Sequence, residues 1–384
     1  MQTVDTVRLK RLISTGAALL MTAWCMTAQS VRSTVYKRGD NGFDTYRIPA
    51  VIQAKDGTLL AFAEARKNSR NDTGDIDLVV RRSSDGGVTW SGIITIWDDA
   101  ENVCGNPSPV VDRNTGRIVL AATWNKGTDK EKEIHARTSD DTRRVFVMYS
   151  DDNGLTWSQA REITDQAKLP EWTWYATGPC HAIQLQSGRI VVPCDHGVFN
   201  NGPAGTHSHI IYSDDIGETW HIGGDPGTGN ESTVAELSNG DLMLNMRGDR
   251  SRSREHFRIV AVSHDRGLTF DTPYSEIQLA EPVCNASICN LGTGRKPSKA
   301  LAFTNPCHES KRKCMTLQVS PDNGKSWSKA MLLTAGDSAY SDLLALKDGS
   351  VGVLYENGRN NPYEQISFVI ISGKQVKKAL KAAR

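Results

Sequence analysis

A short motif that recurs five times constrains the fold of this chain more than any other feature of its sequence. Its consensus is Ser-x-Asp-x-Gly-x-Ser/Thr-Trp/Phe, and successive copies start 67, 63, 50 and 57 residues apart. The copies occupy residues 83–90, 150–157, 213–220, 263–270 and 320–327. Serine and aspartate side chains bond to nearby backbone groups and glycine accepts a positive φ, so each copy predicts a turn. Five copies in 384 residues indicate one repeat architecture.

Glycine turns between apolar runs form a second repeat. They lie at Gly57, Gly116, Gly188, Gly240, Gly294 and Gly349, and five of the six precede a copy of the eight-residue motif by 23 to 34 residues. Asp-Gly and Asn-Gly between apolar runs indicate β-hairpins. Each unit therefore consists of strand, glycine turn, strand, connection, strand, eight-residue motif and strand.

Six such units of about 59 residues account for the 356 residues that follow position 28. They predict an all-β fold, a six-bladed β-propeller of four-stranded antiparallel blades. A β-sandwich is the alternative, but it gives no reason for two motifs at a fixed phase.

The strand pattern also predicts where a functional site lies. Because the chain reverses at every turn, the ends of the strands opposite the glycine turns meet on one face. A strand rises by about 3.3 Å per residue, so residues roughly eight to ten positions from each glycine lie at this opposite face. These positions are polar: Arg47, Asn106, Thr177, Glu231 and Tyr340 before the turn, and Arg66, Trp124, His196, Arg247 and Glu356 after it. Arginines and carboxylates that converge are costly unless they pair or bind a ligand, so this face is the predicted site.

The first 28 residues predict a secretory signal peptide. Three basic residues between positions 8 and 11 precede an apolar run at 12–26, and Ala28 provides a small residue for cleavage. Lipidation of Cys25 is the alternative, disfavoured by the bulky Trp24 before it. We expect residues 29–384 to form one domain that is exported to the periplasm, the cell surface or the medium, with no stable membrane insertion. The formal charge of +1 gives no basic field for nucleic acid.

Cysteine and histidine spacings give no metal-binding motif. The eight cysteines include no Cys-x-x-Cys pair, and the histidines, His207 and His209 among them, show no metal-ligand spacing, so no metal or other cofactor is expected. Export permits disulfides, and three pairs are close in sequence: Cys180/Cys194, Cys284/Cys289 and Cys307/Cys314, which leaves Cys104 alone. Seven free thiols are the equal alternative.

The segment Tyr46-Arg47-Ile48-Pro49, followed by the five motif copies, resembles the bacterial exo-α-sialidase (neuraminidase) family. The resemblance covers residues 36–371. It implies an enzyme that hydrolyses terminal α-linked sialic acids of glycoproteins, glycolipids or oligosaccharides, with retention and through a tyrosyl-enzyme intermediate. Two alternatives stay open: transfer of the sialyl group to another sugar or to the substrate's own hydroxyl, and a sialic-acid-binding propeller without turnover.

The resemblance also assigns site residues. Arg47, Arg247 and Arg312 match the three arginines that bind the substrate carboxylate, for which guanidinium groups offer bidentate bonds. Tyr340 matches the nucleophile and Glu231 its partner, and Glu356 matches the carboxylate that steadies the first arginine. Arg66 matches an additional arginine near O4 of the sugar, and Asp72 matches the acid/base residue, with Asp75 and Asp77 as competitors. Three aromatic residues either wall a pocket for the N-acyl group or pack in the core: Trp172, Trp174 and Tyr175.

Overall fold

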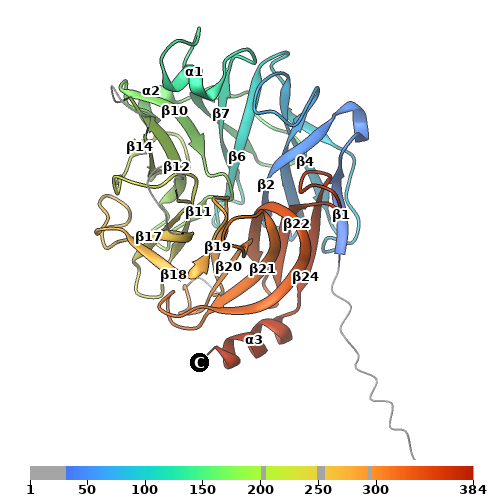
Figure 1. The fold of residues 1–384 in the computed structure, drawn as a ribbon, viewed down its shortest axis with the longest axis vertical. Coiled ribbons are helices and arrows are strands. Elements are labelled where there is room, and N and C mark those ends of the chain that lie inside the picture. The colour runs from blue at the N-terminus through green and yellow to red at the C-terminus, as the bar shows by residue number, and fades with distance from the viewer. Residues whose placement is uncertain (1–31, 200–204, 249–255, 293–295, 384) are drawn as a thin grey trace, which may run out of the picture.

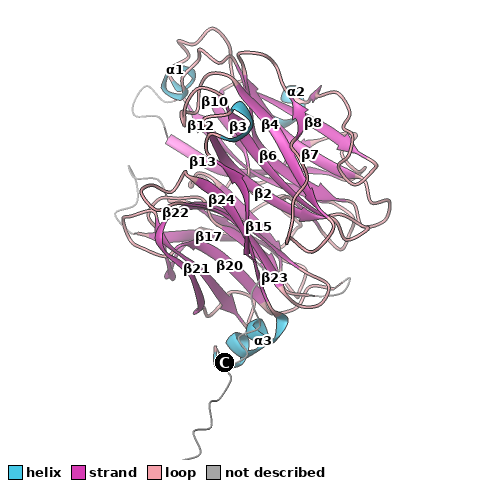
Figure 2. Ribbon diagram, turned by 90° about the vertical axis from the view of Figure 1, so that its right-hand side faces the viewer, coloured by secondary structure: helices cyan, strands magenta, loops and turns pink. Residues whose placement is uncertain are grey.

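The computed structural model describes residues 32–199, 205–248, 256–292 and 296–383 (Figure 1). The predicted signal peptide, with Cys25, and the glycine turn at Gly294 lie outside these residues. Strands account for 48% of the described residues and helices for 7%, which confirms the predicted all-β class. Figure 2 shows the strands filling the molecule, with the helices at its edges.

The first half of the chain forms an eight-stranded sheet. Its strands are β2 (Thr45–Gln53), β3 (Leu59–Arg66), β4 (Ile76–Ser83), β5 (Ile94–Trp97), β6 (Val103–Val111), β7 (Ile118–Asn125), β8 (Arg144–Ser150) and β9 (Arg161–Glu162). The order is β2-β3-β4-β6-β7-β8-β9, with β5 also paired to β4. A single parallel pair, Ile76 with Val103, joins two groups of four antiparallel strands, β2–β5 and β6–β9.

Two smaller antiparallel sheets follow. One contains β10 (Trp172–Thr177), β11 (Ile183–Gln184), β12 (Ile190–Val198), β13 (Gly205–Ser213) and β14 (His221–Ile222), with β10 and β11 both paired to β12. The other contains β15 (Ser232–Glu236), β16 (Leu242–Met246), β17 (Phe257–Ser263) and β18 (Tyr274–Ala280), in sequence order. Each sheet corresponds to one predicted unit.

The last sheet joins the two ends of the described chain. It contains β19 (Ser287–Asn290), β20 (Leu301–Pro306), β21 (Lys313–Ser320), β22 (Ser328–Ala345), β23 (Val351–Asn357), β24 (Gln365–Ile371) and β1 (Arg32–Lys37). The long strand β22 pairs with β21 through its first half and with β23 through its second half. Strand β1 is antiparallel to β24. The last unit, which has no eight-residue motif of its own, thus takes its outer strand from the N-terminal side.

The glycine-turn hairpins of the described chain are confirmed. The antiparallel partners are β2 with β3, β6 with β7, β11 with β12, β15 with β16, and β22 with β23. Gly57 has a φ of 97° in the first of these turns and Gly349 a φ of 82° in the last, a region that residues with a side chain rarely adopt. The strands form four hydrogen-bonded sheets rather than six, so the number of blades remains a prediction.

The eight-residue motifs are tight turns, as predicted. In the first copy, Gly87 donates its backbone N–H to Ser83 Oγ at 2.8 Å, and Thr89 donates to Asp85 Oδ1 at 3.0 Å. The serine–glycine bond recurs in the other four copies at 2.7–2.8 Å. The closing Trp90 packs edge-on against Phe368, with ring centroids 5.4 Å apart. Because Phe368 belongs to β24, this contact fastens neighbouring units together.

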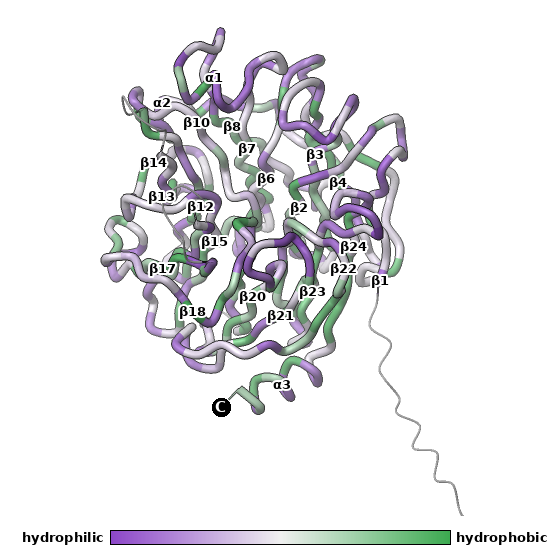
Figure 3. The backbone as a smooth tube through the Cα atoms, in the orientation of Figure 1, coloured by the Kyte–Doolittle hydropathy of each residue, from purple (hydrophilic) through white to green (hydrophobic). Residues whose placement is uncertain are grey.

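The helices are few and peripheral. They are the 3-10 turn η1 (Asp40–Gly42), α1 (Glu131–His135), α2 (Thr164–Ala167) and α3 (Gly373–Ala382). Among the described residues, no helix is both long and apolar enough to cross a bilayer. Figure 3 shows hydrophobic residues along the strands and hydrophilic residues along the connecting loops, as expected for a core made by the sheets.

The seven cysteines of the described chain are all free thiols. Five are buried and two, Cys307 and Cys314, are partly exposed. None of the three disulfides that sequence proximity allowed is therefore formed.

Candidate active site

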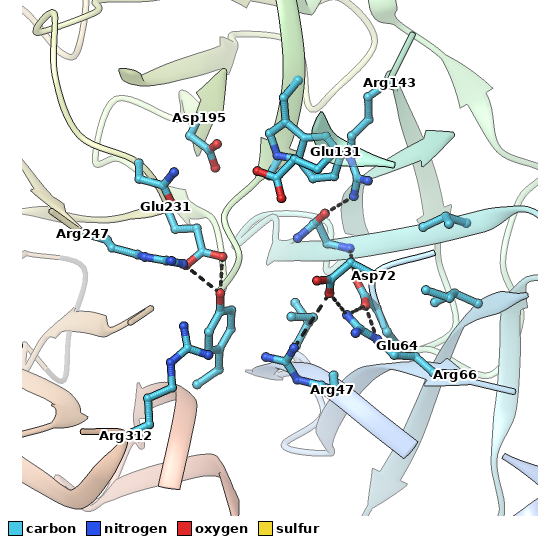
Figure 4. Close-up of a pocket in the computed structure, with 18 residues that line it drawn as sticks. Arg47, Glu64, Arg66, Asp72, Glu131, Arg143, Asp195, Glu231, Arg247 and Arg312 are labelled. Carbon is cyan, nitrogen blue, oxygen red and sulfur yellow. Dashed lines mark hydrogen bonds and ion pairs between the residues drawn. The ribbon is translucent and has the colours of Figure 1, made fainter. Parts of the chain in front are cut away.

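One cavity gathers residues from most of the chain. Eighteen residues line it, and ten of them are arginines or carboxylic acids, five of each: Arg47, Arg66, Arg143, Arg247, Arg312, Glu64, Asp72, Glu131, Asp195 and Glu231 (Figure 4). Its volume of about 210 Å³ is the space of roughly seven waters at 30 Å³ each. Such a cavity fits one sugar-sized charged group rather than a polymer.

Seven of the eight residues assigned by resemblance line this cavity: Arg47, Arg66, Asp72, Glu231, Arg247, Arg312 and Tyr340. The eighth, Glu356, is fully buried directly behind Arg47. Of the three competing aspartates, Asp72 lines the cavity, whereas Asp75 and Asp77 do not. Burial and the neighbouring Asp98 and Asp75 raise the pKa of Asp77 to about 7, so it forms a separate acidic cluster.

Glu356 fixes the position of the first arginine. Its Oε1 accepts bonds from Arg47 Nε and from the backbone N–H of Ile48, both at 3.0 Å, and its Oε2 accepts one from the backbone N–H of Tyr340 at 3.1 Å. Ile48 has a φ of 58°, costly for a β-branched residue, where the pairing of β2 and β3 shifts register. This irregularity aims the Ile48 N–H at the carboxylate. One buried carboxylate therefore holds both Arg47 and the strand segment that carries Tyr340.

The exchange Glu356→Gln is expected to lower the free energy of unfolding by about 3 kcal/mol, because it removes the nearer and buried counter-charge of Arg47. Urea denaturation measures this loss. The control is Glu218→Gln, whose carboxylate is exposed and 3.3 Å from Arg117, and which should change stability by no more than about 0.5 kcal/mol. Equal stabilities of the two variants would refute the structural role of Glu356.

Tyr340, Glu231 and Arg247 form a hydrogen-bonded triad. The Tyr340 hydroxyl donates to Glu231 Oε1 at 2.5 Å and accepts from Arg247 Nη1 at 3.0 Å, and Arg247 also bonds the second oxygen of Glu231. Burial and the Glu231 charge raise the pKa of Tyr340 well above its usual value, in spite of the nearby arginines. The phenol is therefore neutral, and Glu231 is the acceptor for its proton.

Two further arginines flank the same tyrosine. The guanidinium carbons of Arg47 and Arg312 lie 5.0 and 5.3 Å from the centre of the Tyr340 ring. Arg312 also donates to the Tyr363 hydroxyl at 3.0 Å, and Arg47 packs 4.4 Å from the Tyr363 ring centre. Three guanidinium groups thus surround one phenol, which makes an anion-binding pocket around Tyr340.

Asp72 lies across the cavity from Glu231 (Figure 4). It comes from the loop between β3 and β4, and its Oδ1 lies 2.7 Å from Arg66 Nη2 and 3.8 Å from Arg47 Nη1. Arg66 is held in turn by Glu64, whose Oε2 accepts from Arg66 Nε at 3.0 Å. Partial burial acts to raise the pKa of Asp72, but the guanidiniums of Arg66 and Arg47 lower it by more, so the free carboxylate is ionised.

Several lining residues were not assigned from the sequence. Glu64, Glu131, Arg143 and Asp195 all face the cavity. Arg143 is buried, which lowers its pKa to about 10, and it donates to Asn125 Oδ1 at 2.6 Å while packing 4.0 Å from the Trp174 ring centre. Burial raises the pKa of Asp195 well above its usual value, which favours the neutral form of this acid. Trp172 and Tyr175 pack in the core, whereas Trp174 lines the cavity, and its contact with an N-acyl group stays a prediction.

Besides Glu356, three residues placed on this face by their distance from the glycines do not line the cavity: Thr177, Trp124 and His196. Thr177 bonds the backbone oxygen of Asn106 at 2.5 Å, and Trp124 bonds Asp99 at 2.6 Å. His196 is preceded by Asp195, which does face the cavity. Because side chains alternate along a strand, the prediction was wrong by one position on β12.

Metal ligands do not cluster in the described lining of the cavity. Within the described chain, three potential ligands come together at His196, His207 and Asp225, outside the cavity.

Comparisons with known proteins identify relatives of this chain. A family model described as a BNR repeat-like domain matches residues 57–353. The sialidase of Micromonospora viridifaciens is 31% identical over 353 residues, which cover 87% of this chain and 53% of that protein. Sialidase-3 of Rattus norvegicus is 30% identical over 411 residues, which cover 90% of this chain and 96% of the relative. The solved structure of a Hadza microbial sialidase matches with a TM-score of 0.79 at 31% identity, over 89% of this chain and 68% of that one.

The chain covers different fractions of the lengths of these relatives. The chain spans about half of the Micromonospora protein and nearly all of the rat protein.

Proposed function

Because this chain belongs to the sialidase family, we propose that it is an exo-α-sialidase, a glycoside hydrolase that releases terminal α-linked sialic acids from glycoproteins, glycolipids or oligosaccharides. The observation that carries the proposal is the convergence of Arg47, Arg247 and Arg312 around Tyr340. A sialic acid bears its carboxylate on the anomeric carbon, so a pocket that binds the carboxylate also places the anomeric carbon near the phenol. The predicted six-bladed propeller and the predicted export of the chain belong to the same proposal.

The neutral phenol suits this substrate as a nucleophile. A carboxylate nucleophile would be repelled by the substrate's own carboxylate at close range, whereas a phenol carries no charge. Most glycosidases act with a pair of carboxylates, and sialidases, which use a tyrosine as the nucleophile, are an exception. In the first step the Tyr340 oxygen bonds to the anomeric carbon and passes its proton to Glu231, which accepts that hydrogen bond at 2.5 Å.

Asp72 acts on the leaving group in this scheme. It gives its proton to the glycosidic oxygen as that bond breaks. It then takes a proton from the water that attacks the anomeric carbon, while the phenol regains its proton from Glu231, so the sugar leaves with retained configuration. Asp72 must be protonated at the start, although Arg66 and Arg47 lower its pKa in the free site. A substrate carboxylate bound to Arg47 offsets this positive charge and raises the pKa of Asp72.

The residues that line the cavity favour turnover of the substrate over binding alone. A sialic-acid-binding protein needs the arginines, but it has no use for an acid opposite a tyrosine–carboxylate pair. Asp72, Tyr340 and Glu231 all line the cavity. Sialyl transfer uses the same groups and differs only in the acceptor, so the products distinguish transfer from hydrolysis.

Proton NMR of 3′-sialyllactose during digestion tests the proposal. The expected first products are lactose and the α-anomer of free sialic acid, which then converts to the β-anomer in solution. A 2,7-anhydro sugar or a new sialoside in the presence of excess lactose would indicate transfer. Unchanged substrate, or release of the β-anomer first, would contradict the proposal.

The exchange Arg312→Lys is expected to raise KM by well over tenfold. Lysine cannot make the bidentate bonds that a guanidinium makes with a carboxylate. Initial rates over a range of sialyllactose concentrations measure the effect. Arg117→Lys is the control, because Arg117 binds Asp151 at 2.8 Å on the surface, and its KM should equal that of the wild type. An unchanged KM for Arg312→Lys would remove Arg312 from the carboxylate pocket.

A further inference from the structure

Two histidines lie side by side on neighbouring strands behind the cavity wall. His196 of β12 and His207 of β13 are direct partners in the antiparallel register, so their side chains share one face of the sheet. Asp225, from the loop after β14, lies beside them. This face is opposite to the one on which Asp195 meets the cavity, so the cluster is separate from the proposed active site.

The distances within the cluster are those of metal ligands. Asp225 Oδ2 lies 3.1 Å from His207 Nδ1 and 3.7 Å from His196 Nε2, and all three ligand atoms lie within 4.8 Å of one another. Zinc bonds to histidine nitrogen and carboxylate oxygen at about 2.0–2.1 Å, so two ligands of a tetrahedral ion lie about 3.3 Å apart. The observed spacings bracket this value, and the ion would fit between the three groups with small side-chain shifts.

His196 is already oriented as such a ligand. Its side chain is 0% exposed, and its Nε2 has no hydrogen-bond partner among the described residues, although it points towards Asp225. The other nitrogen, Nδ1, lies 3.0 Å from His209 Nδ1, and His209 Nε2 lies 3.1 Å from the Tyr175 hydroxyl. If Nδ1 of His196 donates to His209, then Nε2 presents a lone pair to the cluster. A second hydrogen bond that fixes the tautomer in this way is the usual support of a zinc-binding histidine.

Stacking holds the ring in place as well. The rings of Trp172 and His196 lie 3.6 Å apart at 13°. The ring of His196, with its Nε2, is therefore fixed in the core. A buried polar atom without a partner is costly unless something binds it. His207 and Asp225 are 21% and 31% exposed, which leaves a path from solvent to the site.

We propose that His196, His207 and Asp225 bind a divalent transition-metal ion of the zinc class, with a fourth position open to water. The ion would tie the loop that starts at Asp225 to strand β13. The same loop is already bonded to β13 where Ser208 donates its backbone N–H to the Thr228 oxygen at 2.9 Å and Thr206 bonds the Gly229 oxygen at 2.9 Å. Because this loop runs directly into Glu231, the ion would help to fix the residue that contacts Tyr340.

Isothermal titration of untagged, chelator-treated protein with zinc chloride tests the site. The wild type is expected to bind one equivalent, and its Tm should rise by about 3 °C at saturating zinc. His207→Ala and Asp225→Asn should each weaken binding at least about tenfold. His264→Ala is the control, since His264 contacts Asp241 and Asp271 through different ring nitrogens and cannot direct both contacts to one ion. Its affinity for zinc should match the wild type.

The site is refuted if the wild type binds no stoichiometric zinc, or if binding survives unchanged in both variants. Both exchanged residues are partly exposed, so the variants are expected to fold, and their Tm without zinc verifies this. The readout is binding rather than catalysis, so it is independent of the proposed sialidase activity.

Discussion

The exchange Tyr340→Phe is expected to reduce kcat on sialyllactose by about 10²–10⁴-fold, while the protein still binds sialic acid. Phenylalanine keeps the ring on which Arg47 and Arg312 pack, at 5.0 and 5.3 Å, but removes the oxygen that would attack the anomeric carbon. The carboxylate pocket therefore survives the exchange. Stopped digestions give kcat, and isothermal titration with free sialic acid gives the affinity.

A matched control separates chemistry from folding. Tyr274 is exposed on β18, a strand that contributes no residue to the described lining of the cavity, and Tyr274→Phe should retain wild-type turnover. If Tyr340→Phe also kept wild-type kcat, Tyr340 would not be the nucleophile. A loss of sialic acid binding together with turnover would mean that the hydroxyl serves binding instead.

The second large effect is expected for Asp72→Ala, whose loss of turnover should depend on the leaving group of the substrate. On sialyllactose, whose leaving group needs a proton, turnover should fall by about 10²–10⁴-fold. On an aryl sialoside with an acidic phenol as leaving group, protonation is hardly required, and the first step should be nearly unchanged. Parallel assays on the two substrates measure the difference.

Asp75→Ala is the control for this prediction. Asp75 lies three residues away in the same loop and pairs with Lys67 at 3.4 Å, outside the cavity. The Asp75→Ala variant should turn over both substrates at wild-type rates. Equal losses on both substrates for Asp72→Ala would argue against a role in protonating the leaving group, and a selective loss in Asp75→Ala would transfer that role.

The repeats in the sequence predict the strand pairing well because each repeat has a local physical cause. A serine and an aspartate in fixed positions bond the turn that follows, as Gly87 with Ser83 shows, and a glycine such as Gly57 permits a tight hairpin. Neither signal depends on distant parts of the chain. The outer strand β1 could not be predicted in this way, because its partner β24 lies more than 300 residues away and neither strand contains a motif.

The residues of the candidate site were likewise predictable only where a local sequence signal fixed their position. Residues that begin or end a strand at a fixed distance from a turn, such as Arg47 and Arg247, reach the cavity as expected. The register along a strand is less certain, and a one-residue error exchanges the two faces, as happened for His196 and Asp195. Glu131 and Arg143 both lie in the long β7–β8 connection, where no periodic pattern existed to indicate their direction.

The histidine cluster shows why spacing along the chain can miss a metal site. His196 and His207 are eleven positions apart, a separation typical of no known ligand motif, yet the hairpin register makes them direct neighbours. Asp225 arrives from a third segment. Spacing rules capture ligands on one helix or in one loop, and cross-strand ligands become visible only when the register is known.

The most direct test of the central claim is to trap the covalent intermediate with 2,3-difluorosialic acid. Fluorine at C3 slows both steps and fluoride at C2 leaves readily, so the sugar should accumulate on the nucleophile. Mass spectrometry of the intact protein is expected to show one added sialyl group, and peptide mapping should place it on Tyr340. An adduct on Asp72 or Glu231, or full turnover of sialyllactose with no adduct at all, would contradict the account.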